Sequence, residues 1–268
     1  MTGVAGAGCA GERAGGGGGS KQEVCDRNPK SPPSEVFKTG VEDMELVKTG
    51  KTKDVYKLPN GNYLLKFKDT VTGHASGESD PGGNSVVGSV AGVGSGALKV
   101  TVFYFELLKK NNIFTHYVSA DLSKNEMEVR PAKAFGSGLE FVVRYKAAGS
   151  FVRRFGLYCK EGDELPGILE VTLKDDAHDD PPATCEILMA LKLITRAQYD
   201  KLHSETTRIC DLIRDDLKAR GLELIDIKIE FGLVDGEIAL IDEISAGNMR
   251  VYRDGKKLDY LTLSGLIH

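Results

Sequence analysis

A lysine and several carboxylates alternate with apolar residues in the run LIDIKIEFG at residues 224–232. This period-two pattern predicts a β-strand with one apolar and one polar face. Asp226, Lys228 and Glu230 therefore point in the same direction. Charged groups of both signs on one strand face are suited to a charged ligand, such as a nucleotide and its metal ion.

The connection to the next alternating run decides whether Asp242 joins that face. An Asp-Gly dipeptide at residues 235–236 predicts a hairpin. A two-residue turn would pair Glu230 with Ile241 and direct Asp242 to the other face. A three-residue loop with a glycine bulge would place Glu230 opposite Asp242, with Cβ atoms about 5 Å apart. Two such carboxylates need a cation between them, and Mg²⁺ with nucleotide phosphates fits. The alternative is a solvated polar face, and these strands alone do not decide.

A short basic loop, KTGKTKDVY, supplies positive charge near the start of the patterned chain. Gly50 allows a tight backbone approach, and Lys51 and Lys53 can meet phosphate charge. The run Gly50-Lys51-Thr52 is similar to the end of a Walker loop. Glu45, however, occupies the place of the first Walker glycine, and a strand rather than a helix is predicted to follow, so we reject that interpretation.

Four sequence blocks, in this order, resemble the SAICAR synthetase (phosphoribosylaminoimidazole-succinocarboxamide synthase) family. They are GKTKDVY at 50–56, VRYKAAGSFVRR at 143–154, KDDAHDDP at 174–181, and DIKIEFG at 226–232 with DEIS at 242–245. The similarity covers roughly residues 44–252. Four ordered blocks are far more specific than any one of them.

The resemblance implies an ATP-dependent carbon–nitrogen ligase of purine biosynthesis. In such an enzyme ATP phosphorylates the carboxylate of carboxyaminoimidazole ribonucleotide, and the amine of L-aspartate then attacks the acyl phosphate to give SAICAR, ADP and phosphate. Most of the catalytic work is positioning and charge neutralisation. ATP and Mg²⁺ are the implied cofactors, and the ribonucleotide and L-aspartate are the implied small-molecule partners.

The resemblance also implies site residues, which fall into three groups. The nucleotide and its metal are assigned to Lys51, Lys53, Lys228, Glu230 and Asp242, of which Glu230 and Asp242 bind Mg²⁺. The ribonucleotide phosphate is assigned to Arg144, Ser150 and Arg250, since guanidinium and hydroxyl groups suit phosphate. The catalytic block is assigned to Lys174, Asp175, Asp176 and Asp179. Without the resemblance, that acidic block would be interpreted as a turn before a Pro-Pro pair.

Two segments depart from the family pattern. Residues 245–250 read SAGNMR where many members have Ser-Pro-Asp before the arginine, and residues 70–99 are rich in glycine and serine. These departures bear on which carboxylate the enzyme accepts and which amine it uses. Two other hypotheses therefore stay open: a related amide ligase with a different carboxylate or amine, and a non-catalytic nucleotide-binding regulator. The complete set of nucleotide-site residues argues against the regulator.

Hydrophobic periodicity predicts the elements that position these residues. Helical spacing occurs at 98–110 and 196–220, and strands cluster at 45–68, 116–145 and 223–244. Runs of strands that flank helices indicate an α+β fold. We expect two abutting α+β lobes with the ATP site between them. The first, residues 44–132, would bind ATP, and the second, residues 133–268, would bind the substrate and Mg-ATP.

Composition limits the other functions. Hydrophobic residues make up 41% of the chain and the net charge is −4, which gives no sign of a nucleic-acid-binding surface. No apolar run approaches the roughly 20 residues of a membrane span. The five cysteines are scattered without a CxxC pair, which predicts reduced thiols in the cytoplasm. The sequence leaves open whether the chain forms a homo-oligomer.

The first 43 residues differ from the rest of the chain. They are rich in glycine and alanine, with an unbroken glycine run at 15–19. Such a segment buries too little apolar surface to offset its ordering entropy, so we expect a disordered low-complexity extension. Met44 directly precedes the first predicted strand and is an alternative start site, whereas a regulatory tail is the rival interpretation.

Overall fold

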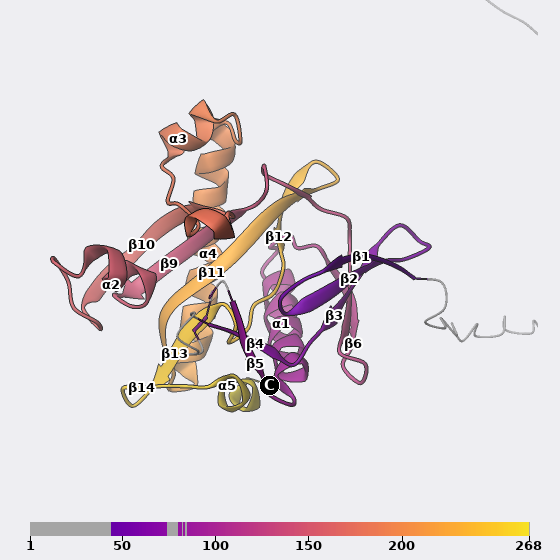
Figure 1. Ribbon diagram of the computed structural model, residues 1–268, viewed down its shortest axis with the longest axis horizontal. Helices are drawn as coiled ribbons and strands as arrows, with labels where there is room; N and C mark the ends of the chain where they lie inside the picture. Colours follow the sequence, from indigo (N-terminus) through magenta and orange to yellow (C-terminus); the bar gives the residue numbers. More distant parts are fainter. Residues whose placement is uncertain (1–43, 74–79, 82, 84, 268) are drawn as a thin grey trace, which may run out of the picture. The chain divides into compact units, whose positions relative to one another are not determined.

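The computed structural model describes residues 44–73, 80, 81, 83 and 85–267, shown in Figure 1. The predicted extension, residues 1–43, lies outside the described residues. From residue 44 onward the described chain belongs to one compact unit. Its antiparallel strands come in runs that flank the helices, which confirms the predicted α+β class.

The first sheet carries the basic loop. Its strands, in spatial order, are β1 (Glu45–Thr49), β2 (Lys53–Lys57), β3 (Tyr63–Phe67), β7 (Glu126–Val129) and β6 (Tyr117–Asp121). β2 and β3 form a hairpin that turns at Asn60-Gly61, where Gly61 has a φ of 87°, a conformation that favours glycine. β1 pairs with β2 as well, so residues 50–52 form the connection between them.

The second sheet is organised around β11 (Glu223–Val234), the strand predicted from alternation. The spatial order is β10 (Glu164–Leu173), β9 (Leu139–Lys146), β11, β13 (Met249–Arg253) and β14 (Lys256–Lys257), while β12 (Glu237–Ile241) and β8 (Lys133–Ala134) also pair with β11. Figure 1 shows β10, β9 and β11 running side by side. On the apolar face, Phe231 of β11 packs edge-on against Phe141 of β9, with ring centroids 5.3 Å apart.

The helices of the described residues are α1 (Val93–Lys110), α2 (Ser150–Phe155), α3 (Cys185–Ala190), α4 (Arg196–Ala219) and α5 (Tyr260–Leu266), with a 3₁₀ turn at Asp176–His178 and a small sheet of β4 (Thr70–Gly73) and β5 (Ser85–Ser89). Of these helices, α1 packs against β3 of the first sheet. α4 begins with a capping box between Thr195 and Gln198, and packs against β11 and β9. In the described part of the chain, no helix combines the length and apolarity that crossing a bilayer requires.

α1 contributes to a core that the two larger sheets share. Tyr104, Phe105 and Leu108 of this helix are fully buried. They belong to one continuous cluster of buried apolar residues that also includes Leu65 of the first sheet and Phe141 of the second. β8, the strand after β7, pairs in the second sheet rather than the first. The proposed lobe boundary at residue 132 stays a prediction.

Candidate active site

The hairpin after β11 has the register of a two-residue turn. Val234 pairs with Glu237, and Glu230 pairs with Ile241. The ladder ends there, and Asp242 adopts the left-handed conformation with a φ of 66°. Asp242 therefore leaves the strand's alternation and lines the same cavity as Glu230. The backbone bend brings these carboxylates together without the glycine bulge.

That cavity, of about 680 Å³, lies between residues of both sheets. The basic loop lines it from the first sheet, and β11 and the 242–248 segment line it from the second. Its charged lining consists of Lys48, Lys51, Lys53, Glu140, Lys174, Asp176, Lys228, Glu230, Asp242 and Glu243, together with Arg130. We call it the larger cavity.

Lys53 is the buried cation at the base of the larger cavity. Its Nζ lies 3.0 Å from Asp242 Oδ1 and donates a hydrogen bond of 2.5 Å to Glu243 Oε1. Burial lowers the pKa of Lys53, but the charges of Asp242 and Glu243 outweigh it and raise the pKa above its usual value. Burial raises the pKa of Asp242, whereas Lys53 and then Lys174 more than reverse this and hold it below its usual range. Lys53 and Asp242 therefore both stay charged at neutral pH.

Two further lysines cross the same cavity. Lys174 Nζ donates to both oxygens of Glu230, at 2.6 and 2.8 Å. Lys51 Nζ lies 2.7 Å from Asp176 Oδ2, so the basic loop contacts the acidic block directly. Burial, and then the charge of Asp242, raise the pKa of Glu230. Lys174 and Lys228 offset part of the repulsion between Glu230 and Asp242.

A second cavity, of about 420 Å³, adjoins the larger one and is called the smaller cavity. Arg144 and Arg250 both donate to the buried Asp226 Oδ2, at 2.9 and 2.6 Å. Arg144 also donates to Ser150 Oγ at 2.9 Å, and Arg250 Nη2 donates to Asp80 Oδ2 at 2.6 Å. The residues predicted to bind a phosphate are therefore gathered at one place.

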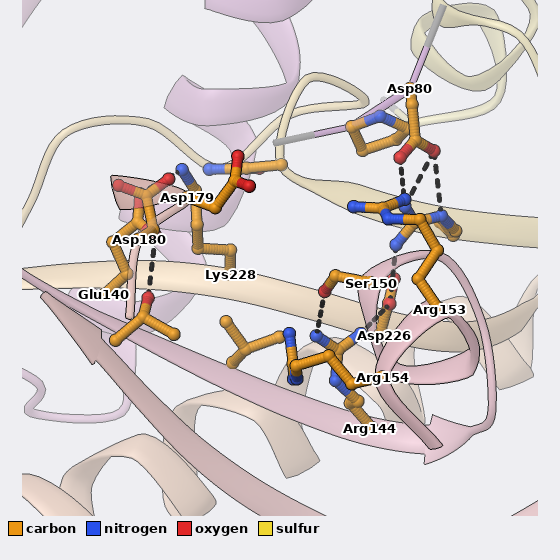
Figure 2. A pocket seen from close by; sticks show the side chains of 15 residues that line it. Asp80, Glu140, Arg144, Ser150, Arg153, Arg154, Asp179, Asp180, Asp226 and Lys228 are labelled. Carbon is orange, nitrogen blue, oxygen red and sulfur yellow. Dashed lines mark hydrogen bonds and ion pairs between the residues drawn. The ribbon is translucent and has the colours of Figure 1, made fainter. Parts of the chain in front are cut away.

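Figure 2 shows that the charges of the smaller cavity are divided between two ends. The arginines, Ser150, Asp80 and Asp226 lie at one end, while Lys228, Glu140, Asp179 and Asp180 lie at the other. A ligand that fits both ends would have an anionic group at the first and its reacting group at the second.

The two cavities share part of their walls. Glu140, Lys228 and Asn248 line both of them. Lys228 Nζ donates to Glu140 Oε1 at 2.6 Å, and Thr172 Oγ1 donates to Glu140 Oε2 at 2.9 Å. Burial lowers the pKa of Lys228, but the charges of Glu140 and Glu230 and the hydrogen bond to Glu140 together outweigh it, so the pKa is raised. A fixed ammonium group therefore marks the junction of the cavities.

The structure separates the members of the predicted catalytic block. Lys174 and Asp176 line the larger cavity, and Asp179 lines the smaller one. Asp175 lies outside both sets of lining residues, and its Oδ2 is 2.7 Å from Nδ1 of His178 within the turn. The predicted role of Asp175 therefore has no support from its position, and the other roles stay predictions.

The comparisons with known proteins agree with this geometry. A family model described as SAICAR synthetase matches residues 46–260. The chain belongs to the SAICAR synthetase family. The phosphoribosylaminoimidazole-succinocarboxamide synthase of Clostridium tetani is 50% identical over 226 residues, which cover 84% of this chain and 99% of that relative.

Solved SAICAR synthetases share the fold. One, in complex with ADP, matches with a TM-score of 0.70 at 29% identity, covering 80% of this chain and 87% of that one. Another, from structural genomics, matches with a TM-score of 0.68 at 35% identity, covering 78% of this chain and 87% of that one. The resemblance inferred from four sequence blocks is confirmed.

Four site residues of this SAICAR synthetase family member escaped the sequence reasoning. They are Asp80, Glu140, Glu170 and Glu243, each of which pairs with a predicted site residue. Glu140 lies three residues before the family block at 143–154, and Glu243 lies inside another block. The sequence signal available for Glu140 was its place in a strand in which polar residues alternate with buried apolar ones. Asp80 stands in a glycine-rich segment that gives no periodicity.

Gly149 makes room for the guanidinium of Arg250 in this SAICAR synthetase site. A Cβ on Gly149 would lie 2.7 Å from Arg250 Cζ, and the residue has a φ of 54°. We expect Gly149→Ala to lower the free energy of unfolding by about 3 kcal/mol, from left-handed strain and overpacking combined. Gly162 has a φ of 87° and open space around it, so Gly162→Ala should cost only about 1 kcal/mol of strain.

Urea unfolding of the two glycine variants measures that difference. Equal losses of stability in Gly149→Ala and Gly162→Ala would show that the Arg250 guanidinium moves aside freely. The close approach of the two residues would then have no structural importance.

Proposed function

We propose that the chain is an ATP-dependent ligase that joins L-aspartate to the carboxylate of carboxyaminoimidazole ribonucleotide through an acyl phosphate, with SAICAR, ADP and phosphate as products. The observation that carries this function is the junction of two charged cavities at Lys228 and Glu140. Phosphoryl transfer between two bound ligands requires their reacting atoms to approach within about 3–3.5 Å. Adjoining cavities with a common wall permit such an approach.

The larger cavity suits the nucleotide. Lys51 and Lys53 come from a short loop that lines it, and lysine is a point charge well suited to phosphate oxygens. A SAICAR synthetase that matches this fold was solved in complex with ADP. We assign Lys51, Lys53 and Lys228 to the phosphates of ATP.

The same cavity has the ligand chemistry of a Mg²⁺ site. Glu230 and Asp242 both line it, and the charge of Asp242 raises the pKa of Glu230. Mutual repulsion of this kind is relieved by a hard divalent cation, which favours carboxylate and phosphate oxygens. We assign Mg²⁺ to Glu230 and Asp242, where it would neutralise charge on the phosphates of ATP. Lys53 and Lys174 hold these two carboxylates in place in the structure described here.

The smaller cavity suits the ribonucleotide. Arg144, Arg250 and Ser150 supply forked guanidinium groups and a hydroxyl at one end, which fits a terminal phosphate. The hydrogen bonds to Asp226 already orient the guanidinium groups of Arg144 and Arg250, so these side chains lose less conformational freedom when a phosphate binds. The opposite end, at Lys228, would then receive the carboxylate that ATP phosphorylates.

Lys174 and the acidic block are assigned to the second half-reaction. Burial lowers the pKa of Lys174, but the charges of Glu230 and Asp242 and the hydrogen bond to Glu230 together outweigh it and the pKa is raised, so the side chain stays an ammonium group. It is therefore a charge stabiliser for the acyl phosphate rather than a base. Asp176 and Asp179 line the cavities and can orient the attacking amine of L-aspartate. We place the reaction in the cytoplasm, which agrees with the three unpaired cysteines among the described residues.

The decisive experiment is ADP release by the purified protein with Mg²⁺-ATP, carboxyaminoimidazole ribonucleotide and L-aspartate, omitting each component in turn. We expect release only with all components present, and a product with the mass of SAICAR. ADP release that does not depend on L-aspartate, or an amide product with another amine, would reject this substrate assignment in favour of a related ligase.

Asp242→Asn tests the metal assignment. The change keeps the size of the side chain but removes a charge that the Mg²⁺ site needs. We expect kcat/KM for Mg²⁺-ATP to fall about 100-fold, the order found when one electrostatic stabiliser is removed. Asp200→Asn, on the exposed face of α4, is the matched control. ADP production by Asp242→Asn at the rate of the control would remove Asp242 from the mechanism.

A further inference from the structure

Three consecutive carbonyl groups of the basic loop are hydrogen-bonded from the same side. The carbonyl oxygen of Gly50 accepts from Lys68 Nζ at 2.6 Å, and that of Lys51 accepts from Thr70 Oγ1 at 2.6 Å. The carbonyl oxygen of Thr52 accepts from the backbone N–H of Lys68 at 2.8 Å. The carbonyl oxygens of all three residues that connect β1 to β2 are therefore held by hydrogen bonds.

The donors stand behind the loop, outside the larger cavity. Gly50, Lys51 and Thr52 line that cavity, whereas Lys68 and Thr70 are absent from its described lining. In a trans peptide the C=O and the following N–H point in opposite directions. Bonds that draw the carbonyls of Gly50 and Lys51 backward therefore turn the N–H groups of Lys51 and Thr52 forward. Successive N–H groups that point into a cavity form an anion-binding concavity.

The short segment 68–70 is itself held on three sides. Lys68 Nζ donates to Asp54 Oδ1 at 3.0 Å, which keeps the ammonium group beside the loop. Asp69 Oδ1 accepts the N–H of Gly94 at 2.9 Å, which ties the segment to the first turn of α1. A Cβ on Gly94 would lie 2.8 Å from the carbonyl oxygen of Lys68, so the helix backbone abuts the segment directly. The support is therefore rigid.

We propose that Lys68 and Thr70 are positioning residues for the phosphate end of ATP: they hold the loop carbonyls away from the larger cavity and so present its N–H groups and Lys51 to the phosphates. The inference rests on the proposed function, because it assumes that the larger cavity binds ATP. Neither residue touches the ligand. Their loss should weaken the binding of phosphate groups and leave the binding of the nucleoside unchanged.

Thr70→Val is the primary test, since it removes one hydroxyl and keeps the shape of the side chain. We expect the affinity for ATP to fall about 10-fold, the effect of one lost hydrogen bond, with the affinity for adenosine unchanged within about twofold. Calorimetry measures ATP binding, and competition against ATP measures adenosine binding. KM for ATP should rise by the same factor with kcat retained at saturating ATP. Thr70→Ser, which keeps the hydroxyl, should restore the wild-type values.

Thr207→Val is the matched control, because its hydroxyl also donates to a backbone carbonyl, that of His203, on the exposed face of α4. It should change neither affinity. Lys68→Met provides a second variant and should produce the same loss for ATP only, while Lys68→Arg retains the donor to Gly50 and should lose less.

The outcomes separate this inference from the function on which it rests. Equal weakening of ATP and adenosine by Thr70→Val, or no weakening of either, would overturn the positioning role while the wild type still binds ATP and turns over. Failure of the wild-type protein to bind ATP at all would instead reject the proposed function, and the inference with it.

Discussion

Lys53→Met is expected to lower kcat/KM for Mg²⁺-ATP about 1,000-fold, because the substitution removes the buried positive charge that we assign to the phosphates of ATP. The ammonium group of Lys53 lies between Asp242 and Glu243 in the larger cavity. Without it, these two carboxylates repel both each other and the incoming phosphates. ADP release and ATP calorimetry measure the effect, and Lys53→Arg, which keeps the charge in a bulkier group, should retain more activity.

The same substitution should lower the free energy of unfolding by about 3 kcal/mol at pH 7, since it takes from Asp242 and Glu243 the cation that pairs with both of them. The pKa of Asp242 is held below its usual value in the folded protein, so its contribution to stability is present above pH about 3.9 and is lost as pH falls through the folded pKa. In Lys53→Met the folded protein lacks the charge that lowers the pKa of Asp242 most, so Asp242 is protonated more readily. The deficit against wild type should therefore shrink as pH is lowered from 7 toward about 4.

Lys66→Met is the control for stability. Lys66 lies on the neighbouring strand and makes an ion pair of 3.4 Å with Glu126 at the surface, which is worth less than about 1 kcal/mol. If Lys53→Met lost no more stability than Lys66→Met, and the loss did not vary with pH, the buried ion pairs of Lys53 would not stabilise the fold.

Local periodicity was sufficient to predict the strand that organises the site. Asp226, Lys228 and Glu230 alternate with buried apolar residues, and in the structure each of them lines a cavity. α4 was predicted to within one residue, because its apolar stripe and its end signals are strong. α1 begins five residues earlier than predicted, at Val93, since the glycines and serine of its first turn conceal the helical pattern.

The parts that sequence reasoning missed depend on contacts between distant segments. Lys53 and Glu243 are 190 residues apart, and no local pattern marks Glu243 as the partner of the basic loop. Asp242 reaches the cavity only because its backbone adopts a positive φ after the ladder ends. Alternation, extrapolated past the last ladder pair, places this side chain on the wrong face. Tertiary packing therefore decides what the period-two pattern leaves open.

The junction of the two cavities also offers a group that can act on phosphoryl transfer itself, beyond the binding of the two ligands. Lys228 is the cation that lines both cavities from the centre of β11. With ATP and the ribonucleotide bound as we propose, the phosphoryl group that passes to the carboxylate would carry negative charge through this junction, and an ammonium group fixed by Glu140 can stabilise that charge without rearranging. Lys228 should therefore affect the rate of transfer more than the affinity for either ligand.

Lys228→Met is expected to lower kcat about 1,000-fold while the dissociation constants of ATP and the ribonucleotide each change less than about 10-fold. Positional isotope exchange in ATP labelled at the β,γ-bridging oxygen, with the ribonucleotide present and L-aspartate omitted, measures reversible transfer directly. Exchange should be lost in Lys228→Met. Lys146→Met, at a partly exposed lysine on β9 that pairs with Glu223 at 2.7 Å, is the matched control.

Adding Glu140→Gln to Lys228→Met separates chemistry from folding. The single variant leaves the buried carboxylate of Glu140 without its cation, and the second change removes that charge. Stability should then recover by about 2 kcal/mol while isotope exchange stays absent. Recovery of exchange together with stability would show that the single variant failed through misfolding. Exchange near the wild-type rate in Lys228→Met, with only KM for ATP raised, would restrict Lys228 to nucleotide binding and place the transfer elsewhere in the cavities.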